Sequence, residues 1–246
     1  MKRVLITGAS SGIGAAAANL FLERGWKVIM MDKNKDEKSF ENLKNTYKDN
    51  VYFYQGDVSH NDDVMLLFDY ALEKMDGVDC VINNAGIILH GALHEVSEPE
   101  WDDVFNTDVK SIYLTSKFFI PDLIKKGGGT IVNTASISGL LADYKMPVYN
   151  AAKGAVVNLT RAMALDYGRF NIRVNSVCPG ATDTQMLHRG SIPIERFAEV
   201  NPLLRICKPE EIAKAMFFLA SDESSYCNGV NLPVTGGLEV HTGQPK

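Results

Sequence analysis

Short apolar runs alternate along the chain with longer segments of helical periodicity. The apolar runs predict strands near residues 3–7, 27–31, 51–55, 78–83, 130–135, 172–177 and 229–233. The helical segments lie near residues 12–24, 36–47, 60–75, 99–126, 148–168 and 209–220. Most of the runs are apolar without strict alternation, which is typical of strands whose two faces are both covered by helices. The pattern therefore predicts an α/β fold of the doubly wound Rossmann type, with a parallel sheet of about seven strands.

One segment departs from this alternation. It lies between Pro179 and Pro209, is rich in Gly and Pro, and holds a short helical pattern near residues 194–200. Connections of this length usually form lids or binding loops, and this one follows the end of a strand, where open α/β sheets bind ligands. No linker, repeat or low-complexity tract interrupts the chain. We therefore expect one domain over residues 1–246, with a substrate loop at about 181–208.

Composition and charge exclude several classes of protein. Hydrophobic residues make up 46% of the 246 residues and charged residues 22%, as in an ordinary globular protein. The net charge of −5 is spread along the chain, and apolar runs are too short to cross a membrane, so neither nucleic acid nor a membrane is the expected partner. The start of the chain leads straight into a strand without a secretory signal pattern.

The cysteines and histidines predict neither disulfides nor a metal site. The four cysteines are far apart and form no Cys-x-x-Cys pair, which favours reduced thiols in a cytoplasmic protein. His90 and His94 are four residues apart but flank Gly91 in a predicted loop, so we expect no metal there.

A glycine-rich turn lies between the first strand and the first helix. It reads Gly8-Ala9-Ser10-Ser11-Gly12-Ile13-Gly14, with the spacing Gly-x-x-x-Gly-x-Gly. Such a sequence is often only a turn. Between a strand and a helix, however, glycines let the backbone approach a pyrophosphate, and the amides and dipole of the helix N-terminus attract the anion. We interpret the turn as a dinucleotide site.

The second strand ends in an acidic residue. Asp32 follows residues 27–31, and its carboxylate could accept hydrogen bonds from the adenosine ribose of a dinucleotide. The same charge would repel a 2′-phosphate, so we predict NAD rather than NADP as the cofactor. Lys33 could offset that charge or point to solvent, and a plain strand-ending Asp is the alternative interpretation.

Tyr149 and Lys153 lie four residues apart in a predicted helix, and therefore on one helical face. A lysine ammonium favours the phenolate and would lower the tyrosine pKa from about 10 towards the working range. Tyr149 is thus a candidate general acid/base. The alternative is a half-buried tyrosine beside a solvated lysine.

Further polar motifs follow the fourth and fifth predicted strands, at the same sheet edge: Asn83-Asn84-Ala85-Gly86 and Ser136. With them the motifs of the chain are Thr7-Gly8-x-x-x-Gly12-x-Gly14, Asp57, Asn83-Asn84-Ala85-Gly86, Ser136, Tyr149-x-x-x-Lys153, Asn175, Pro179-Gly180 and Thr184. In these motifs the chain resembles the classical short-chain dehydrogenase/reductase family. The resemblance covers essentially the whole chain, and the motifs are highly specific as a set.

The resemblance implies a role for each matching residue. Tyr149 would exchange a proton with the substrate oxygen, Ser136 would position that oxygen, and Lys153 would bind the nicotinamide ribose. Ser138 is a rival to Ser136 and more plausibly lines the substrate pocket, so the implied substrate-contacting residues are Ser136, Ser138 and Tyr149. The implied cofactor-binding residues, besides Tyr149 and Lys153, are Gly8, Ser10, Gly12, Ile13, Gly14, Asp32, Asp57, Val58, Asn84, Ala85, Gly86, Pro179, Gly180, Thr182 and Thr184.

The chain departs from the family at one catalytic position. The family has an asparagine seven residues beyond a tryptophan, where it holds a water that links the lysine to solvent. Counting from Trp101 leads to Asp108, while Asn106 would face about 200° away around the helix. Asp108 is therefore a fourth candidate catalytic residue, which could hold the water, accept the relayed proton or favour the Lys153 ammonium. A local shift of the alignment and a low activity are the alternatives. A second departure, Thr235 where Asp is common, we interpret as structural.

The resemblance implies an NAD-dependent oxidoreductase that transfers a hydride between the cofactor and a secondary alcohol or ketone. A non-catalytic NAD-binding regulator or scaffold on the same fold is the alternative. An extended-type epimerase would need a longer C-terminal part, and an enoyl reductase would place the lysine further from the tyrosine. The substrate stays open between a polyol, sugar, hydroxy acid, steroid or acyl thioester. The resemblance also implies a homotetramer in which the helices near 99–126 and 148–168 pair between subunits.

Overall fold

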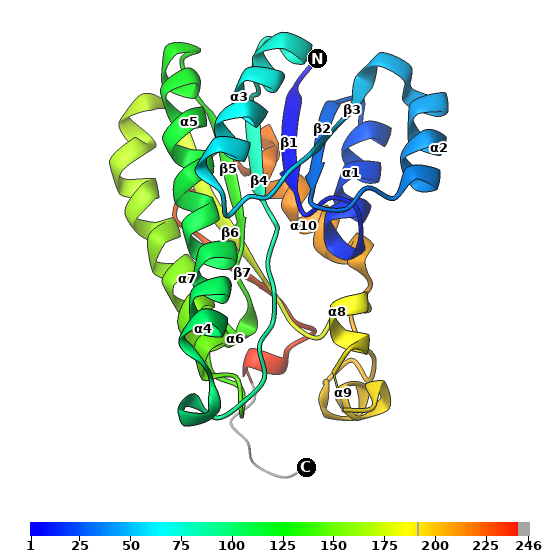
Figure 1. The fold of residues 1–246 in the computed structure, drawn as a ribbon, viewed down its shortest axis with the longest axis vertical. Helices are drawn as coiled ribbons and strands as arrows, with labels where there is room; N and C mark the ends of the chain where they lie inside the picture. Colours follow the sequence, from blue (N-terminus) through cyan, green and yellow to red (C-terminus); the bar gives the residue numbers. More distant parts are fainter. Residues whose placement is uncertain (191, 241–246) are drawn as a thin grey trace.

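A parallel seven-stranded sheet forms the centre of the molecule. The computed structural model describes residues 1–190 and 192–240. The strand order is β3-β2-β1-β4-β5-β6-β7, and every neighbouring pair is parallel, which confirms the predicted fold class (Figure 1). The strands are β1 (Arg3–Thr7), β2 (Lys27–Asp32), β3 (Val51–Gln55), β4 (Cys80–Asn83), β5 (Gly129–Thr134), β6 (Ile172–Pro179) and β7 (Asn231–Val234).

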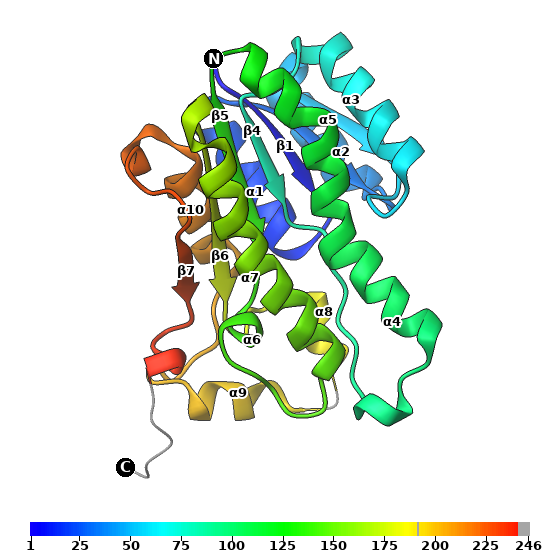
Figure 2. The ribbon, with the colours of Figure 1, turned by 90° about the vertical axis from the view of Figure 1, so that its left-hand side faces the viewer.

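Helices cover both faces of the sheet, as Figures 1 and 2 show. One face carries α1 (Gly12–Glu23), α2 (Glu37–Tyr47) and α10 (Pro209–Ala220), packed around a core that includes Phe21. The other carries α3 (Asn61–Met75), α5 (Ser111–Lys125) and α7 (Pro147–Tyr167), packed around a core that includes Phe119. Both phenylalanine side chains are fully buried. The two-sided cover explains why the strands are apolar without alternation.

The strand order reverses at β1, which lies between β2 and β4. Leu5 pairs with Ile29 on one side and with Val81 on the other. Ligands of open α/β sheets bind beyond the carboxyl ends of the strands at such a switch point. All carboxyl ends meet at the lower edge of the sheet in Figure 1, where α6 (Ile137–Leu140), α8 (Gln185–His188) and α9 (Ile194–Val200) also lie.

The helix expected over residues 99–126 is present but is interrupted by a π-helical turn. The structure has α4 (Glu98–Phe105), then a π-helical turn η3 (Asn106–Lys110), then α5. A π turn adds a residue to one helical turn and is frequent at functional sites. It rotates the side chains that follow it, so helical periodicity counted across it fails. Asp108 lies within this turn and is buried.

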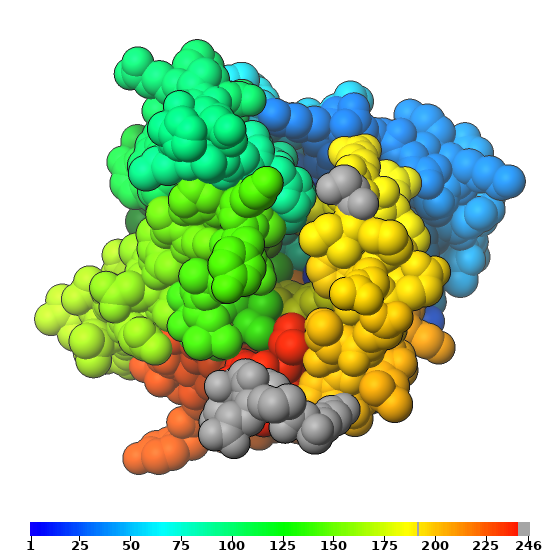
Figure 3. Space-filling view, turned by 90° about the horizontal axis from the view of Figure 1, so that it is seen from below, coloured from blue at the N-terminus to red at the C-terminus, as the bar shows by residue number. Residues whose placement is uncertain are grey.

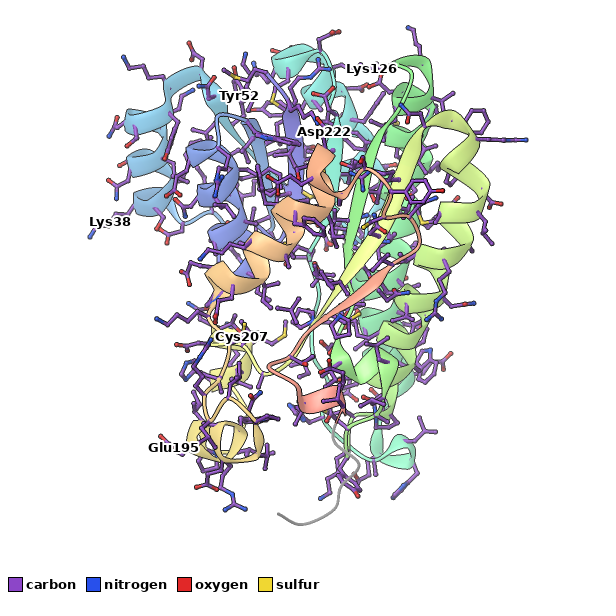
Figure 4. All side chains as sticks on the ribbon, turned by 180° about the vertical axis from the view of Figure 1, so that it is seen from behind. Lys38, Tyr52, Lys126, Glu195, Cys207 and Asp222 are labelled. Atoms are coloured by element: carbon purple, nitrogen blue, oxygen red, sulfur yellow. The ribbon has the colours of Figure 1, made fainter. Side chains whose placement is uncertain are left out.

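The segment after β6 is closed at its base. Thr182 forms a parallel bridge with Cys207, with hydrogen bonds from Asp183 N to Cys207 O at 2.8 Å and from Cys207 N to Ala181 O at 2.9 Å. Figure 4 shows Cys207 near α10 and Glu195 at the far end, in α9. The predicted helix at residues 194–200 is confirmed. We name residues 184–206 the lid; its Ser191 lies outside the described residues. No helix in the described part of the chain is long and apolar enough to cross a bilayer.

Candidate active site

The glycine turn after β1 is fastened to the turn after β4. The Asn84 side-chain amide donates to the carbonyl oxygens of Thr7 and Gly8, both at 3.1 Å. The Thr7 hydroxyl accepts from the backbone N–H groups of Asn84 and Ala85, at 3.0 and 3.1 Å. Gly8 has a φ of +64°, and a Cβ there would lie 2.8 Å from Ala85 Cα. Only glycine satisfies both the conformation and the close approach.

The N-terminus of α1 fits an anion. Within residues 11–15, the N-cap residue Ser11 makes no side-chain capping hydrogen bond, and the first turn holds no acidic residue. The first N–H groups of a helix need partners and, with the helix dipole, favour a phosphate. The turn thus brings Ser10, Gly12, Ile13 and Gly14 to a position that suits a pyrophosphate.

Asp32 lies beside this turn, held by backbone amides. Its Oδ2 accepts from Ser10 N at 3.0 Å and its Oδ1 from Asn34 N at 3.1 Å. Lys33 does not offset Asp32. It forms an ion pair with Asp57, Nζ to Oδ2, at 2.7 Å. The carboxylate therefore faces the predicted adenosine side of the site in a fixed orientation.

The two residues predicted to bracket the adenine also have structural contacts. Asp57 Oδ1 accepts from Ser59 N at 2.9 Å, which orders the turn before α3. Val58 is almost fully buried and belongs to the core under α3. Both residues follow β3, and so lie at the edge that carries Asp32.

The structure brings Tyr149, Lys153 and Ser136 together. All three are buried, at 9%, 4% and 7% exposure, so the alternative of a solvated lysine is wrong. Lys153 Nζ lies 5.6 Å from the Tyr149 ring and donates to Thr134 O at 3.0 Å. A Cβ on Gly139 would lie 2.5 Å from Lys153 O, so glycine lets α6 pack directly on α7. This packing places Ser136 beside the tyrosine.

The expected lowering of the Tyr149 pKa is wrong. Burial raises the pKa of the phenol, Lys153 lowers it, and Asp108 raises it again, so the pKa is above its ordinary value. Sequence reasoning counted the lysine alone. Burial and the carboxylate beside the lysine together outweigh the effect of Lys153 on the phenol.

Asp108 forms an ion pair with Lys153 at 3.0 Å, between Oδ2 and Nζ, and both side chains are at most 5% exposed. Its Oδ1 accepts from Ile87 N at 2.8 Å. Burial opposes the charge on Lys153, but Asp108 and Tyr149 outweigh it and raise the pKa of Lys153. Burial raises the pKa of Asp108 as well, against the opposing effects of Lys153 and the Ile87 amide. Since the N–O distance and the Ile87 amide favour the charged form, we describe the pair as carboxylate and ammonium.

The turn after β4 reaches this pair. A Cβ on Gly86 would lie 3.1 Å from Asp108 Oδ2 and 3.2 Å from Lys153 Nζ. The run Asn84-Ala85-Gly86 therefore extends from the glycine turn to the catalytic groups. A dinucleotide bound along it would span the distance between Asp32 and Tyr149.

The segment that leads from β6 into the lid lies against the glycine turn. Pro179 ends β6, Gly180 follows it, and the Thr182 hydroxyl donates to Gly180 O at 2.9 Å. Thr184 caps α8, with its hydroxyl accepting from Leu187 N at 3.4 Å. A Cβ on Gly12 would lie 3.1 Å from Thr184 Cγ2, so the lid begins against the glycine turn. Figure 3 shows the recess between the lid, in yellow, and the segment around α6, in green.

Ser138 extends the polar site away from Tyr149. Ser136 Oγ donates to Ser138 Oγ at 3.2 Å, and Ser138 Oγ donates to the Asp143 carboxylate. Asn150, next to Tyr149 on α7, holds this loop by donating to Asp143 O at 2.9 Å. Sequence analysis placed Ser138 in the substrate pocket without predicting its contact with Asp143.

Sequence reasoning missed a buried amide network beneath the site. Asn83 donates to Asn133 at 2.9 Å, and Asn133 donates to Thr160 at 3.0 Å. Thr115 on α5 donates to Asn83 at 2.8 Å. These bonds join α5 and α7 to the ends of β4 and β5. The signal was present as two asparagines inside otherwise apolar strands.

Two further motif residues are structural. Asn175 donates to Cys227 O at 2.9 Å and accepts from Val230 N at 3.0 Å, so it secures the segment before β7. Thr235 is buried, accepts from Gly237 N at 3.3 Å and hydrogen-bonds Glu239. Among the described residues no three His, Cys, Asp or Glu side chains group as metal ligands would.

The chain is similar to known proteins in both sequence and structure. Residues 8–239 match a family model described as enoyl-(acyl carrier protein) reductase. The chain is 42% identical to a meso-2,3-butanediol dehydrogenase of Serratia marcescens, over 100% of this chain and 97% of that protein. It superposes with a TM-score of 0.90 on a 3-ketoacyl-(acyl-carrier-protein) reductase from Brucella melitensis complexed with NADH, at 32% identity over 97% and 98% of the chains. The structure of ElxO with NADP bound gives a TM-score of 0.91 at 30% identity, over 98% and 100% of the chains.

The matches extend over nearly the whole chain and agree with the glycine turn, the strand order and the Tyr149-x-x-x-Lys153 helix. The chain therefore belongs to the short-chain dehydrogenase/reductase family and is an oxidoreductase of secondary alcohols that uses a nicotinamide cofactor.

Proposed function

We propose that this protein transfers a hydride between NAD(H) and a small secondary alcohol or ketone, with Tyr149 as the general acid/base. The observation that carries the proposal is the convergence of Tyr149, Lys153 and Ser136 at the sheet edge that also holds the glycine turn. The similarity to a butanediol dehydrogenase favours a small alcohol over a bulky one.

Each of the three converging residues has its own role in the reaction. The bound nicotinamide supplies the hydride acceptor or donor. Ser136 donates a hydrogen bond to the substrate oxygen and orients the carbinol towards the cofactor groove. Tyr149 removes the hydroxyl proton in oxidation and returns it in reduction. Lys153, fixed by Thr134 O, favours the phenolate and binds the nicotinamide ribose.

Asp108 acts on Lys153 in this proposal. At 3.0 Å it holds the lysine as an ammonium and fixes its position beneath Tyr149. It thereby takes the place of the asparagine of the family, and its carboxylate can also receive a proton relayed from the lysine. Asp108 is thus a positioning residue for Lys153 and the end point that we propose for the proton relay.

The preference for NAD over NADP rests on charges around Asp32. The carboxylate is oriented by Ser10 N and Asn34 N. The two nearest lysines in sequence are engaged elsewhere, Lys33 with Asp57 and Lys35 with Glu37, each at 2.7 Å. An added 2′-phosphate would therefore meet a carboxylate without a compensating lysine from this segment.

The test is cofactor-linked oxidation of short secondary alcohols, measured with NAD and with NADP. We expect Tyr149→Phe to reduce kcat by about a thousandfold or more while NADH binding, followed by fluorescence, is retained. Tyr144→Phe is the matched control, since Tyr144 is 99% exposed in the same region. Unchanged turnover in Tyr149→Phe would refute the assignment. Cofactor binding without turnover in the wild type would favour the non-catalytic regulator, and equal use of NADP would refute the Asp32 argument.

We also propose that the protein is a cytoplasmic homotetramer. The helices expected to pair between subunits expose apolar side chains: Tyr113 on α5 is 56% exposed and Leu165 on α7 is 85% exposed. All four cysteines are free thiols, as in a reducing compartment. Sedimentation should give a tetramer, and Leu165→Glu should shift it towards smaller species. A stable wild-type monomer would contradict the assembly.

A further inference from the structure

The hydrogen-bond chain from Ser136 to Asp143 has a defined direction. An ionised carboxylate only accepts hydrogen bonds, so Ser138 must give its single hydroxyl proton to Asp143. Ser136 must then be the donor in its 3.2 Å contact with Ser138. Ser138 Oγ is left with acceptor capacity on the side of Ser136.

This polarity determines what Ser138 can bind. When Ser136 donates to the reacting oxygen of a substrate, the lone pair of Ser138 that it contacted becomes available to the same molecule. That lone pair binds an O–H group and not a carbonyl or ether oxygen. The contact is strengthened because Asp143 polarises the serine hydroxyl.

The distance between the Ser136 and Ser138 hydroxyl oxygens suits a substrate with oxygens on two adjacent carbons. The two serine oxygens are 3.2 Å apart. The two oxygens of a gauche vicinal diol lie at a similar separation, roughly 3 Å. A substrate can therefore place its reacting oxygen at Ser136 and its adjacent hydroxyl at Ser138.

Ser138 and Asp143 are held in place by contacts with α7. Ser138 is 4% exposed and lies on α6, which packs on α7 through Gly139. Asp143 is held by Asn150, which donates to its carbonyl and accepts from its N–H at 3.4 Å. The charge of Asp143 also raises the pKa of Tyr149, so it acts at the reacting centre. A substrate carboxylate next to the carbinol would be repelled by it.

We propose that Ser138 and Asp143 recognise a second hydroxyl group on the carbon adjacent to the reacting carbinol. The preferred substrates are then neutral vicinal diols, and the products are α-hydroxy ketones. This inference rests on the proposed function, because it concerns the substrate of that same site.

The experiment compares kcat/KM for NAD-linked oxidation of four alcohols with the whole protein. They are 2,3-butanediol, 2-butanol, 3-methoxy-2-butanol and lactate. The methyl ether keeps the second oxygen but carries a methyl group in place of its proton, so it can no longer donate a hydrogen bond. We expect the diol to exceed 2-butanol and the methyl ether each by about tenfold or more, and lactate to be the poorest.

Two variants test whether Ser138 and Asp143 cause the preference for the diol. Ser138→Ala should bring the ratio of diol to 2-butanol close to one. Asp143→Asn should narrow the difference between the diol and its methyl ether, because the freed Ser138 proton can turn to an ether oxygen. Asp69→Asn, an exposed carboxylate on α3, is the control and should leave both ratios unchanged. Thermal unfolding of each variant checks that it folds.

The outcomes separate the two proposals. Turnover of the diol, 2-butanol and the methyl ether at equal kcat/KM, or an unchanged ratio in Ser138→Ala, would overturn the second-hydroxyl site and leave the oxidoreductase proposal intact. A lack of NAD-linked turnover with every alcohol would overturn both.

Discussion

Replacing Asp108 with asparagine tests the electrostatics of the site. Lys153 Nζ lies 5.6 Å from the centre of the Tyr149 ring, and an ammonium at that distance stabilises a phenolate by about 3 kcal/mol at an effective dielectric constant of about 20. Asp108, at 3.0 Å from the same ammonium, cancels part of that gain. Asp108→Asn removes this opposing charge and therefore lowers the Tyr149 pKa.

The role of Tyr149 in the reaction determines in which direction the pH profile of kcat/KM moves in Asp108→Asn. In alcohol oxidation Tyr149 acts as a base, so kcat/KM rises with pH as the phenol deprotonates. Removing the Asp108 charge favours the phenolate, and the rise should begin at lower pH in the variant. At the plateau we expect kcat within about tenfold of the wild type, since an amide oxygen can still accept from Ile87 N or Lys153.

The assay is the pH profile of kcat/KM for one alcohol, with Asp69→Asn as the control. Urea unfolding is measured in parallel, because a buried ammonium that loses its carboxylate costs up to about 3–5 kcal/mol of stability. A profile that does not move, or that moves to higher pH, would refute the electrostatic account. Complete loss of turnover in a folded variant would show that the carboxylate itself carries the proton.

Three other changes have expected outcomes. Gly139→Ala should lower kcat by about tenfold or more, because its Cβ would lie 2.5 Å from Lys153 O and separate α6 from α7; unchanged kinetics in the folded variant would contradict this packing. Asp32→Ser should raise the NADP-to-NAD ratio of kcat/KM by about tenfold, and an unchanged ratio would remove Asp32 from cofactor selection. Arg205 lowers the pKa of Glu211 to about 2 from its ordinary 4.5, so their pairing stabilises the fold above about pH 4.5 and is lost as pH falls towards 2. Because the side chains of Arg205 and Glu211 are 48% and 34% exposed, solvent screens the pair, and Glu211→Gln should lower the melting temperature only slightly at pH 7 and not at all near pH 2; a larger loss would show a stronger coupling to the lid.

The parallel seven-stranded sheet and the edge at which the polar motifs gather followed from local patterns. The apolar runs, the glycine turn and the position of each polar motif after a strand were sufficient, because the carboxyl ends of parallel strands share an edge. Counting from Trp101 to Asp108 also identified the residue that contacts Lys153, although the helix between them contains a π turn.

Other properties depend on contacts between distant segments. Hydrophobic periodicity does not reveal one inserted residue, so η3 was interpreted as part of a continuous α-helix. The Tyr149 pKa was assigned the wrong direction because burial and the Asp108 charge arise only once α5, α7 and the β4 turn pack together. The direction of the Ser136–Ser138–Asp143 hydrogen bonds likewise needs the loop that Asn150 holds.

The closed base of the lid bears on how this fold diversifies. Because Thr182 pairs with Cys207, residues 184–206 leave and rejoin the core at adjacent points. Closing a longer excursion costs little chain entropy, about 0.6 kcal/mol for each doubling of its length. The lid can therefore vary in length and sequence at little entropic cost, as long as Thr184 keeps its contact with Gly12 and Asn201 its hydrogen bond to Thr235 O. We expect substrate range to evolve, or to be engineered, in the remainder of this segment.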